Sequence, residues 1–265
     1  MKKFTLFLVL TLAIVSCDKK DDDKLTSGIN SYPMNIGTEW VYNRQVIIEK
    51  YDSAISNKIA EIDTINFITK VSIDKDTILN DSMNVVLFKS QEDNSSWTSI
   101  HYYYMDKEGL RIYAYSNAGA VVFPKKSGCS QFINLYTLVD KRFRTNNEMY
   151  FEVPPTLNIE LPLENNSVWT YRKPSESSKL QIDKEVVGSE SLMLNERSFK
   201  CLKVKYIYRY EPVFDGIDIT DWISEEGLIK RLTTIDSVAV TDEPGELMYI
   251  ARITESVTLK DLKIQ

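Results

Sequence analysis

Residues 33–42 read PMNIGTEWVY, and residues 162–171 repeat the pattern as PLENNSVWTY, with the proline, tryptophan and tyrosine at the same spacing. In each copy the two aromatic residues are two positions apart, so they share one face of a β-strand, where large rings anchor a core. Gly37 and Asn166 precede these strands at equivalent places, and both residue types adopt positive φ readily. We therefore predict a tight turn and then a core strand in each half of the chain.

Two shorter matches follow the decamer in the same order in both halves. Residues 73–78 (IDKDTI) match residues 182–187 (IDKEVV), and residues 104–110 (YMDKEGL) match residues 222–228 (WISEEGL). Gly109 and Gly227, in the last pair, predict a hairpin turn or a β-bulge. Three matches in the same order indicate two copies of one structural unit.

The rest of the sequence is dominated by period-two alternation, the pattern of antiparallel strands with one wet face. Residues 202–210 alternate apolar and mostly charged side chains, and residues 246–260 place an apolar row on one side: Leu247, Tyr249, Ala251, Ile253, Val257 and Leu259. Helical periodicity occurs once with any strength, between Ser130 and Phe143. A strand pair through the same apolar residues is the alternative there.

These patterns predict an all-β, mainly antiparallel fold with at most one or two short helices. Two divergent β repeats would form a curved sheet, a half-barrel or a sandwich. We expect the first repeat at residues 32–123 and the second at 157–265. The connection between them, residues 124–156, has room for the short helix and contains Pro154-Pro155, which interrupts regular structure.

The N-terminus predicts export and lipid anchoring. Two lysines and an uncharged apolar run lead to Ile14-Val15-Ser16-Cys17, which resembles the lipobox of bacterial lipoproteins. In that reading residues 1–16 are a signal peptide, Cys17 is lipidated, and residues 17–31 form a flexible acidic tether between the membrane and the fold. An ordinary signal peptide with an incidental cysteine is the alternative.

The charged segment Asp18–Lys24 is similar to the export signal that sends Bacteroidota lipoproteins to the outer face of the outer membrane. We therefore expect the protein to face the cell exterior, with a periplasm-facing anchor as the alternative. The motifs at residues 32–42, 201–204 and 222–230 resemble a group of uncharacterised Bacteroidota lipoproteins. That resemblance implies secretion and an all-β fold akin to the curved half-barrels of lipoprotein carriers. It supplies no catalytic residues.

Charge and composition exclude several functions. The chain has a net charge of −6, and loss of residues 1–16 removes two more lysines, so nucleic acid is not expected as a partner. The single histidine, His101, lies in an aromatic strand pattern, where a packed residue is the simpler reading, and one histidine with two distant cysteines builds no zinc site. We predict no catalytic residue, no metal and no cofactor. Whether Cys129 and Cys201 form a disulfide stays open.

Five hydroxyl residues fit the Asp-Ser/Thr-aliphatic rule for O-glycosylation of exported Bacteroidota proteins: Ser53, Thr64, Thr77, Ser82 and Ser237. The alternative is that Asp-Ser and Asp-Thr pairs serve as ordinary hairpin residues. A second acidic stretch, residues 215–221, lacks the ligands of a calcium loop, and we expect it to be a loop between strands.

The functional expectation is a non-enzymatic binding or structural module, tethered to a membrane, with a glycan, peptide or protein as partner. Tyr102, Tyr103 and Tyr104 cannot all face inward on one strand, so at least one of them is a candidate for the ligand surface. A carrier or chaperone for lipid, with an apolar cavity inside a curved sheet, is the first alternative. A hydrolase that uses two carboxylates is the second.

Overall fold

The structure is a computed structural model, and it describes residues 28–51, 59–80, 82–93, 98–116, 121–122, 132–133, 149–174, 181–209, 216–241 and 247–265. All regular structure in these residues is β, and the strands are antiparallel, so the predicted fold class is confirmed. The strands are β1 (Glu39–Tyr51), β2 (Ile59–Leu79), β3 (Met83–Glu92), β4 (Thr98–Asp106), β5 (Gly109–Ser116), β6 (Val121–Val122), β7 (Phe132–Ile133), β8 (Met149–Glu160), β9 (Val168–Arg172), β10 (Gln181–Leu194), β11 (Arg197–Arg209), β12 (Ile217–Ser224), β13 (Gly227–Thr241) and β14 (Leu247–Lys263).

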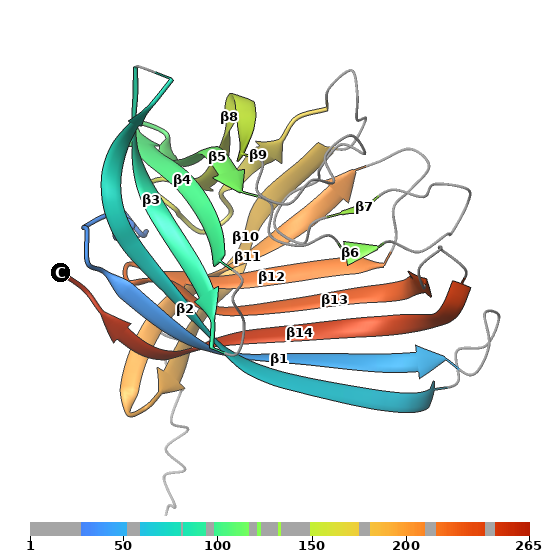
Figure 1. The fold of residues 1–265 in the computed structure, drawn as a ribbon. Coiled ribbons are helices and arrows are strands. Elements are labelled where there is room, and N and C mark those ends of the chain that lie inside the picture. The colour runs from blue at the N-terminus through green and yellow to red at the C-terminus, as the bar shows by residue number, and fades with distance from the viewer. Residues whose placement is uncertain are drawn as a thin grey trace, which may run out of the picture.

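Twelve strands form one sheet in the order β8-β5-β4-β3-β2-β1-β14-β13-β12-β11-β10-β9, and β6 pairs with β7 separately. The sheet therefore consists of two six-stranded meanders, β1 to β5 with β8 and β9 to β14, joined where β1 pairs with β14. It curves so strongly that its two edge strands, β8 and β9, approach each other without a ladder between them (Figure 1). The result is a nearly closed, barrel-like sheet with one seam between β8 and β9, and we call it the half-barrel.

The repeated decamer supplies the first strand of each meander. Trp40 and Tyr42 lie on β1, Trp169 and Tyr171 lie on β9, and all four are buried. The turns ahead of these strands have positive φ, 87° at Gly37 and 66° at Asn166, as predicted. The two other predicted glycine turns also have positive φ, at Gly109 between β4 and β5 and at Gly227 between β12 and β13.

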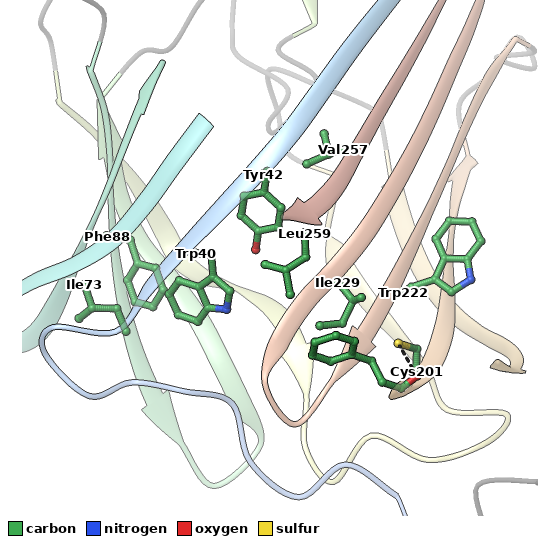
Figure 2. Close-up of a cluster of buried hydrophobic side chains, with 10 residues drawn as sticks. Trp40, Tyr42, Ile73, Phe88, Cys201, Trp222, Ile229, Val257 and Leu259 are labelled. Atoms are coloured by element: carbon green, nitrogen blue, oxygen red, sulfur yellow. Dashed lines mark hydrogen bonds between the residues drawn. The ribbon is translucent and has the colours of Figure 1, made fainter. Parts of the chain in front are cut away.

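Register places alternate residues of every strand on the concave face, because residues directly opposite each other in an antiparallel ladder point to the same side. Trp40, Phe88 and Tyr103 are on this face, and Tyr103 of β4 packs against apolar clusters that contain residues of β9, β11 and β12. Trp40 and Phe88 stack with ring centres 6.0 Å apart (Figure 2). The core is thus filled across the barrel from both meanders.

The two ends of the half-barrel differ. At one end, which we call the turn end, short connections join β2 to β3, β4 to β5, β10 to β11 and β12 to β13. Residues 28–38 cross this end as a strap: Ile29 is buried and pairs with Leu163 through two backbone hydrogen bonds of 2.8 Å. At the other end, the loop end, the connections 52–58, 94–97, 175–180, 210–215 and 242–246 lie outside the described residues, and so does the connection 117–148 except for β6 and β7.

Some sequence predictions need adjustment at this level. Ile29 belongs to the core, although the sequence places it in the tether. Phe132 and Ile133 form strand β7, so the predicted helix is absent at these two positions, and the rest of that stretch lies outside the described residues. The loop expected at residues 215–221 is wrong from Ile217 onward, because β12 begins there. No described helix has the length and apolar character to cross a bilayer.

Candidate functional site

Charged side chains lie on the concave face, among the apolar ones. Arg44 on β1 stands opposite Val257 on β14, and Val257 stands opposite Arg231 on β13, so the two arginines occupy one row of the sheet. Each arginine is held by carboxylates of neighbouring strands. Toward the loop end beyond this row, the face of β1 to β4 is partly exposed, whereas a buried apolar cluster continues on β5, β8 and β9 to β12.

Arg44 binds two carboxylates. Its Nη1 lies 2.7 Å from Glu92 Oε1, and its Nε forms a short ion pair with Glu255. Glu255 is 2% exposed, whereas the Glu92 side chain is 37% exposed. The guanidinium also lies over the ring of Phe67, 4.5 Å from its centre. One cation therefore organises two acids and one aromatic ring on β1, β2, β3 and β14.

Arg231 forms the second group with Asp221 of β12. Its Nε and Nη2 lie 2.5 Å and 2.7 Å from the two carboxylate oxygens, a bidentate pair. The Tyr206 hydroxyl donates to Asp221 Oδ2 at 3.0 Å. Burial and the adjacent Asp221 charge raise the pKa of Tyr206 well above its ordinary value, so the hydroxyl stays a donor at neutral pH.

Lys184 of β10 forms the third group, across the seam. Its Nζ donates to the backbone oxygen of Asn158 on β8 at 2.8 Å and to the Asn158 side-chain oxygen at 3.0 Å. The ammonium lies 4.3 Å and 4.4 Å from the ring centres of Tyr171 and Tyr206. Burial lowers the pKa of Lys184 to about 7, against the opposing effect of the Asp221 charge.

Toward the loop end the concave face becomes partly exposed. The ladders β1–β2, β2–β3 and β3–β4 place six half-buried side chains side by side there: Arg44, Phe67, Ser90, Glu92, Ser99 and His101. We call these six residues the concave patch. Next to it, Thr69 is 8% exposed, and among the described residues its hydroxyl has no hydrogen-bond partner.

His101 contributes a neutral ring to the concave patch. Its imidazole stacks with Tyr103 and with Tyr115, with ring centres 6.0 Å apart in each case. The resulting desolvation lowers the pKa of His101 to about 4, so at neutral pH the ring carries one N–H donor and one acceptor nitrogen. The patch as a whole combines aromatic surface, hydroxyls and ion-paired charge.

The three candidate tyrosines of the sequence are split between the two faces of β4. Tyr103 is on the concave face beside His101, whereas Tyr102 and Tyr104 are on the convex face in a second apolar cluster. Tyr102 is buried and Tyr104 half-buried. Only Tyr103 therefore adjoins the concave patch, and a ligand role for any of the three stays a prediction.

The O-glycosylation candidates lie apart from this face or outside the description. Thr64 on β2 and Ser82 beside the β2–β3 turn are exposed, and Thr77 on β2 is half-buried. Ser53 lies outside the described residues, and Ser237 is on β13 with its side chain outside the description. Modification of these hydroxyls stays a prediction, as does lipidation of Cys17, which also lies outside the described residues.

Cys201 is a free thiol and 0% exposed. Burial, with the nearby Glu226 and Glu190 charges, raises its pKa to about 12. No disulfide therefore links it to Cys129, which itself lies outside the described residues. The part of the chain that the structure describes also holds no group of three or more His, Cys, Asp or Glu side chains placed to bind a metal ion.

Sequence reasoning missed the residues that give this face its character: Arg44, Phe67, Glu92, Lys184 and Glu255. A signal existed for two of them. Glu255 occupies the vacant place in the apolar row of residues 247–259. Arg44 likewise continues the side of Trp40 and Tyr42 on β1. A charged residue at an inward position of an alternating strand is a place to expect a buried ion pair.

The sequence matches no protein-family model and no curated protein. Among solved structures, the chain is similar to a crystal structure of a Parabacteroides distasonis protein that is provisionally described as a lipoprotein. The identity is 16%, the TM-score is 0.34, and the match covers 89% of this chain and 99% of the other. A TM-score this low does not establish a common fold, so the function is argued from this chain's own residues.

Proposed function

We propose that this chain is a lipid-anchored, non-enzymatic binding protein whose ligand lies on the concave patch. The observation that carries the proposal is the change of character along the concave face. On β1 to β4 this face is apolar toward the turn end, where the strap closes it, and toward the loop end it presents partly exposed rings, hydroxyls and ion-paired charges, whereas on the other strands buried apolar side chains continue toward the loop end. Recognition sites combine apolar surface with a few placed polar groups in this way.

The concave patch lies toward the end of the sheet at which the longer connections join the strands. Six connections lie at that end, against short turns at the other. Loops on a rigid scaffold commonly carry binding residues because their sequences vary without cost to the sheet. The concave patch begins just below them, at the last residue of β3 and the second residue of β4.

The same geometry disfavours hydrolysis by two carboxylates. Such a reaction needs two carboxylates that face each other across the bond to be broken, whereas Glu92 and Glu255 both bind the same Arg44 guanidinium. Asp221 is bound by Arg231 in the same manner. We therefore propose binding without catalysis.

Transport of lipid inside the half-barrel receives less support. A lipid carrier needs a continuous apolar lining for the acyl chains. The row that contains Arg44 and Arg231, with Glu255 beside it, crosses the concave face, and desolvating such groups around a hydrocarbon chain is costly. A polar ligand avoids this cost.

The anchor fits the position of the strap. The described chain begins at Gly28, eleven residues after Cys17, and the strap crosses the turn end. Eleven residues reach at most about 40 Å when extended. A lipid on Cys17 would therefore hold the turn end near the membrane and leave the concave patch accessible, on the outer membrane and facing the exterior.

Binding at the patch is tested with the mature chain without its lipid, against neutral oligosaccharides, peptides and phospholipid vesicles. Glu92→Gln alters the patch, and Glu39→Gln is the matched control, since Glu39 is an ion-paired carboxylate of β1 on the convex face. We expect the first variant to weaken binding and the second to leave it unchanged. Binding that only the control alters, or no binding by any class, contradicts the proposal.

Anchoring is tested separately in the native host. A Cys17→Ala protein should leave the membrane fraction, and protease added to intact cells should degrade the wild-type protein if it faces the exterior. Membrane partition of the Cys17→Ala protein contradicts the anchor. Protection from protease in intact cells, with digestion after outer-membrane disruption, supports the periplasm-facing alternative.

A further inference from the structure

We infer that the concave patch binds an uncharged carbohydrate. The hydroxyls of the sugar would form hydrogen bonds with Glu92, with Arg44 and with the serine and histidine side chains of the patch. The inference rests on the proposed binding function and names the ligand class of the same site. It depends on the charge of the patch, on the alternation of its donors and acceptors, and on its aromatic surface.

The charge of the patch disfavours anionic ligands. One guanidinium, Arg44, faces two carboxylates, Glu92 and Glu255, so the group has an excess of one negative charge. The next cation on this face, Lys50, is likewise bound by two carboxylates, Glu61 at 3.0 Å and Asp63 at 2.8 Å. A phosphate, sulfate or carboxylate ligand would meet acids that already hold these cations.

The polar groups of the patch match hydroxyls better than ammonium groups. A hydroxyl donates and accepts from one oxygen, so neighbouring hydroxyls on a sugar ring can give a proton to Glu92 and accept one from a group beside it. Ser90 and Ser99 face each other on β3 and β4, and the neutral His101 follows two residues after Ser99. An ammonium ligand could use only the acceptors of this set.

Thr69 gives an independent indication that a polar ligand belongs here. Its hydroxyl is buried on the concave face, directly opposite Glu92 in the β2–β3 ladder, and lacks a hydrogen-bond partner among the described residues. A buried hydroxyl without a partner costs free energy.

Aromatic surface completes the site. The Arg44 guanidinium covers one face of Phe67, the rest of this half-buried ring is partly exposed, and His101 continues into a row with Tyr103 and Tyr115. The axial C–H groups of a sugar ring form an apolar face that packs on such rings, while its equatorial hydroxyls point to the polar groups at the side. The patch thus offers both kinds of contact that a neutral sugar requires.

The experiment measures binding of neutral, sulfated and amine-bearing oligosaccharides of equal length to the mature chain without its lipid, at low and high salt. We expect the neutral set to bind, with an affinity that salt hardly changes, because no net charge is paired on binding. Phe67→Ala should weaken it about ten-fold, and Tyr104→Ala, on the convex face, should leave it unchanged. Glu92→Gln keeps the shape of the side chain, and as a second variant it should also weaken binding.

The outcomes separate this inference from the proposed function. Binding restricted to amine-bearing sugars or basic peptides, lost at high salt and sensitive to Glu92→Gln, would overturn the carbohydrate inference and leave the concave patch as a binding site. Neutral sugars that bind equally well to wild type, Phe67→Ala and Glu92→Gln would overturn both. Thermal unfolding of each variant shows whether a loss of binding arises from a loss of fold.

Discussion

Lys184 Nζ on β10 lies 2.8 Å from the backbone oxygen of Asn158 on β8, across the seam where the two edge strands meet. No ladder joins β8 to β9, although the opposite junction of the two meanders, β1 with β14, is fully paired. A second link, the ion pair of Arg172 with Glu152, spans the same seam. Side chains therefore hold the last gap in the barrel where backbone hydrogen bonds close the rest.

This arrangement makes the stability of the protein depend on pH through Lys184. Burial lowers the folded-state pKa to about 7, whereas an exposed lysine in the unfolded chain titrates near the usual value of about 10.4. Between these values the unfolded state binds the additional proton, so this residue makes the free energy of unfolding rise with pH from about 7 to about 10. Below pH 7 Lys184 is charged in the folded protein, and the full cost of burying its charge lowers the free energy of unfolding.

Lys184→Met should remove this dependence. At pH 9 the wild-type amine is neutral and still donates to Asn158, so the variant leaves two acceptors unpaired and should lose about 1–3 kcal/mol. At pH 6 the wild type also bears the cost of a buried charge, and the loss should be smaller. Denaturant unfolding of both proteins at pH 6, 7, 8 and 9 measures the difference. A difference that stays constant over this range would contradict the lowered pKa.

Gly109 tests the fit of the first glycine turn. Its φ is +138°, and a Cβ there would lie 2.1 Å from the backbone oxygen of Ile159 on β8. Gly109→Ala should therefore destabilise the fold by about 3 kcal/mol or more, as strain and overlap add. Gly188, with φ +153° and no atom within 4 Å of an added Cβ, is the control for strain alone.

The comparison of the two alanine variants uses thermal or urea unfolding. Gly188→Ala should cost only about 1–2 kcal/mol, the range of backbone strain. Equal losses for the two variants would show that β8 moves away from the turn at little cost. That result would contradict a fixed approach of β8 to the β4–β5 hairpin.

The fold was largely predictable because its signals are local. The spacing of Trp40 and Tyr42, the turn residues Gly37 and Asn166, and the alternation of residues 246–260 each depend on neighbours in sequence. The strap was not predictable, because the burial of Ile29 depends on Leu163, over a hundred residues away. The same holds for Arg44 and Glu255, which meet only because β1 pairs with β14.

Cys201 provides a probe of opening in the second meander. Its thiol is buried and its pKa is raised to about 12, so almost none of it is thiolate at pH 8 in the folded protein. In a soluble chain without Cys17 and with Cys129→Ser, a thiol reagent should label no residue when native and one when denatured. Rapid native labelling at pH 8 would contradict the burial of this side chain.

The two tryptophans of the repeated decamer should respond differently to the same substitution. Trp40 Nε1 donates to the backbone oxygen of Glu226 at 2.7 Å, next to Gly227, so the first decamer holds the β12–β13 turn of the other meander. Trp169 is equally buried, and among the described residues its Nε1 has no hydrogen-bond partner. The repeat therefore conserves the ring in both places but uses the indole N–H in one.

Trp40→Phe should cost about 1–3 kcal/mol more than Trp169→Phe, because the first change leaves the Glu226 oxygen unpaired and the second removes a buried donor that has no partner among the described residues. Both changes delete similar apolar volume, so the cavity term largely cancels in the comparison. Urea unfolding of both variants measures the difference, with one common slope for the dependence of the unfolding free energy on urea concentration. If Trp169→Phe proves the more damaging, the indole N–H of Trp169 has a partner outside the described residues, and the two decamers are closer in role than their contacts indicate.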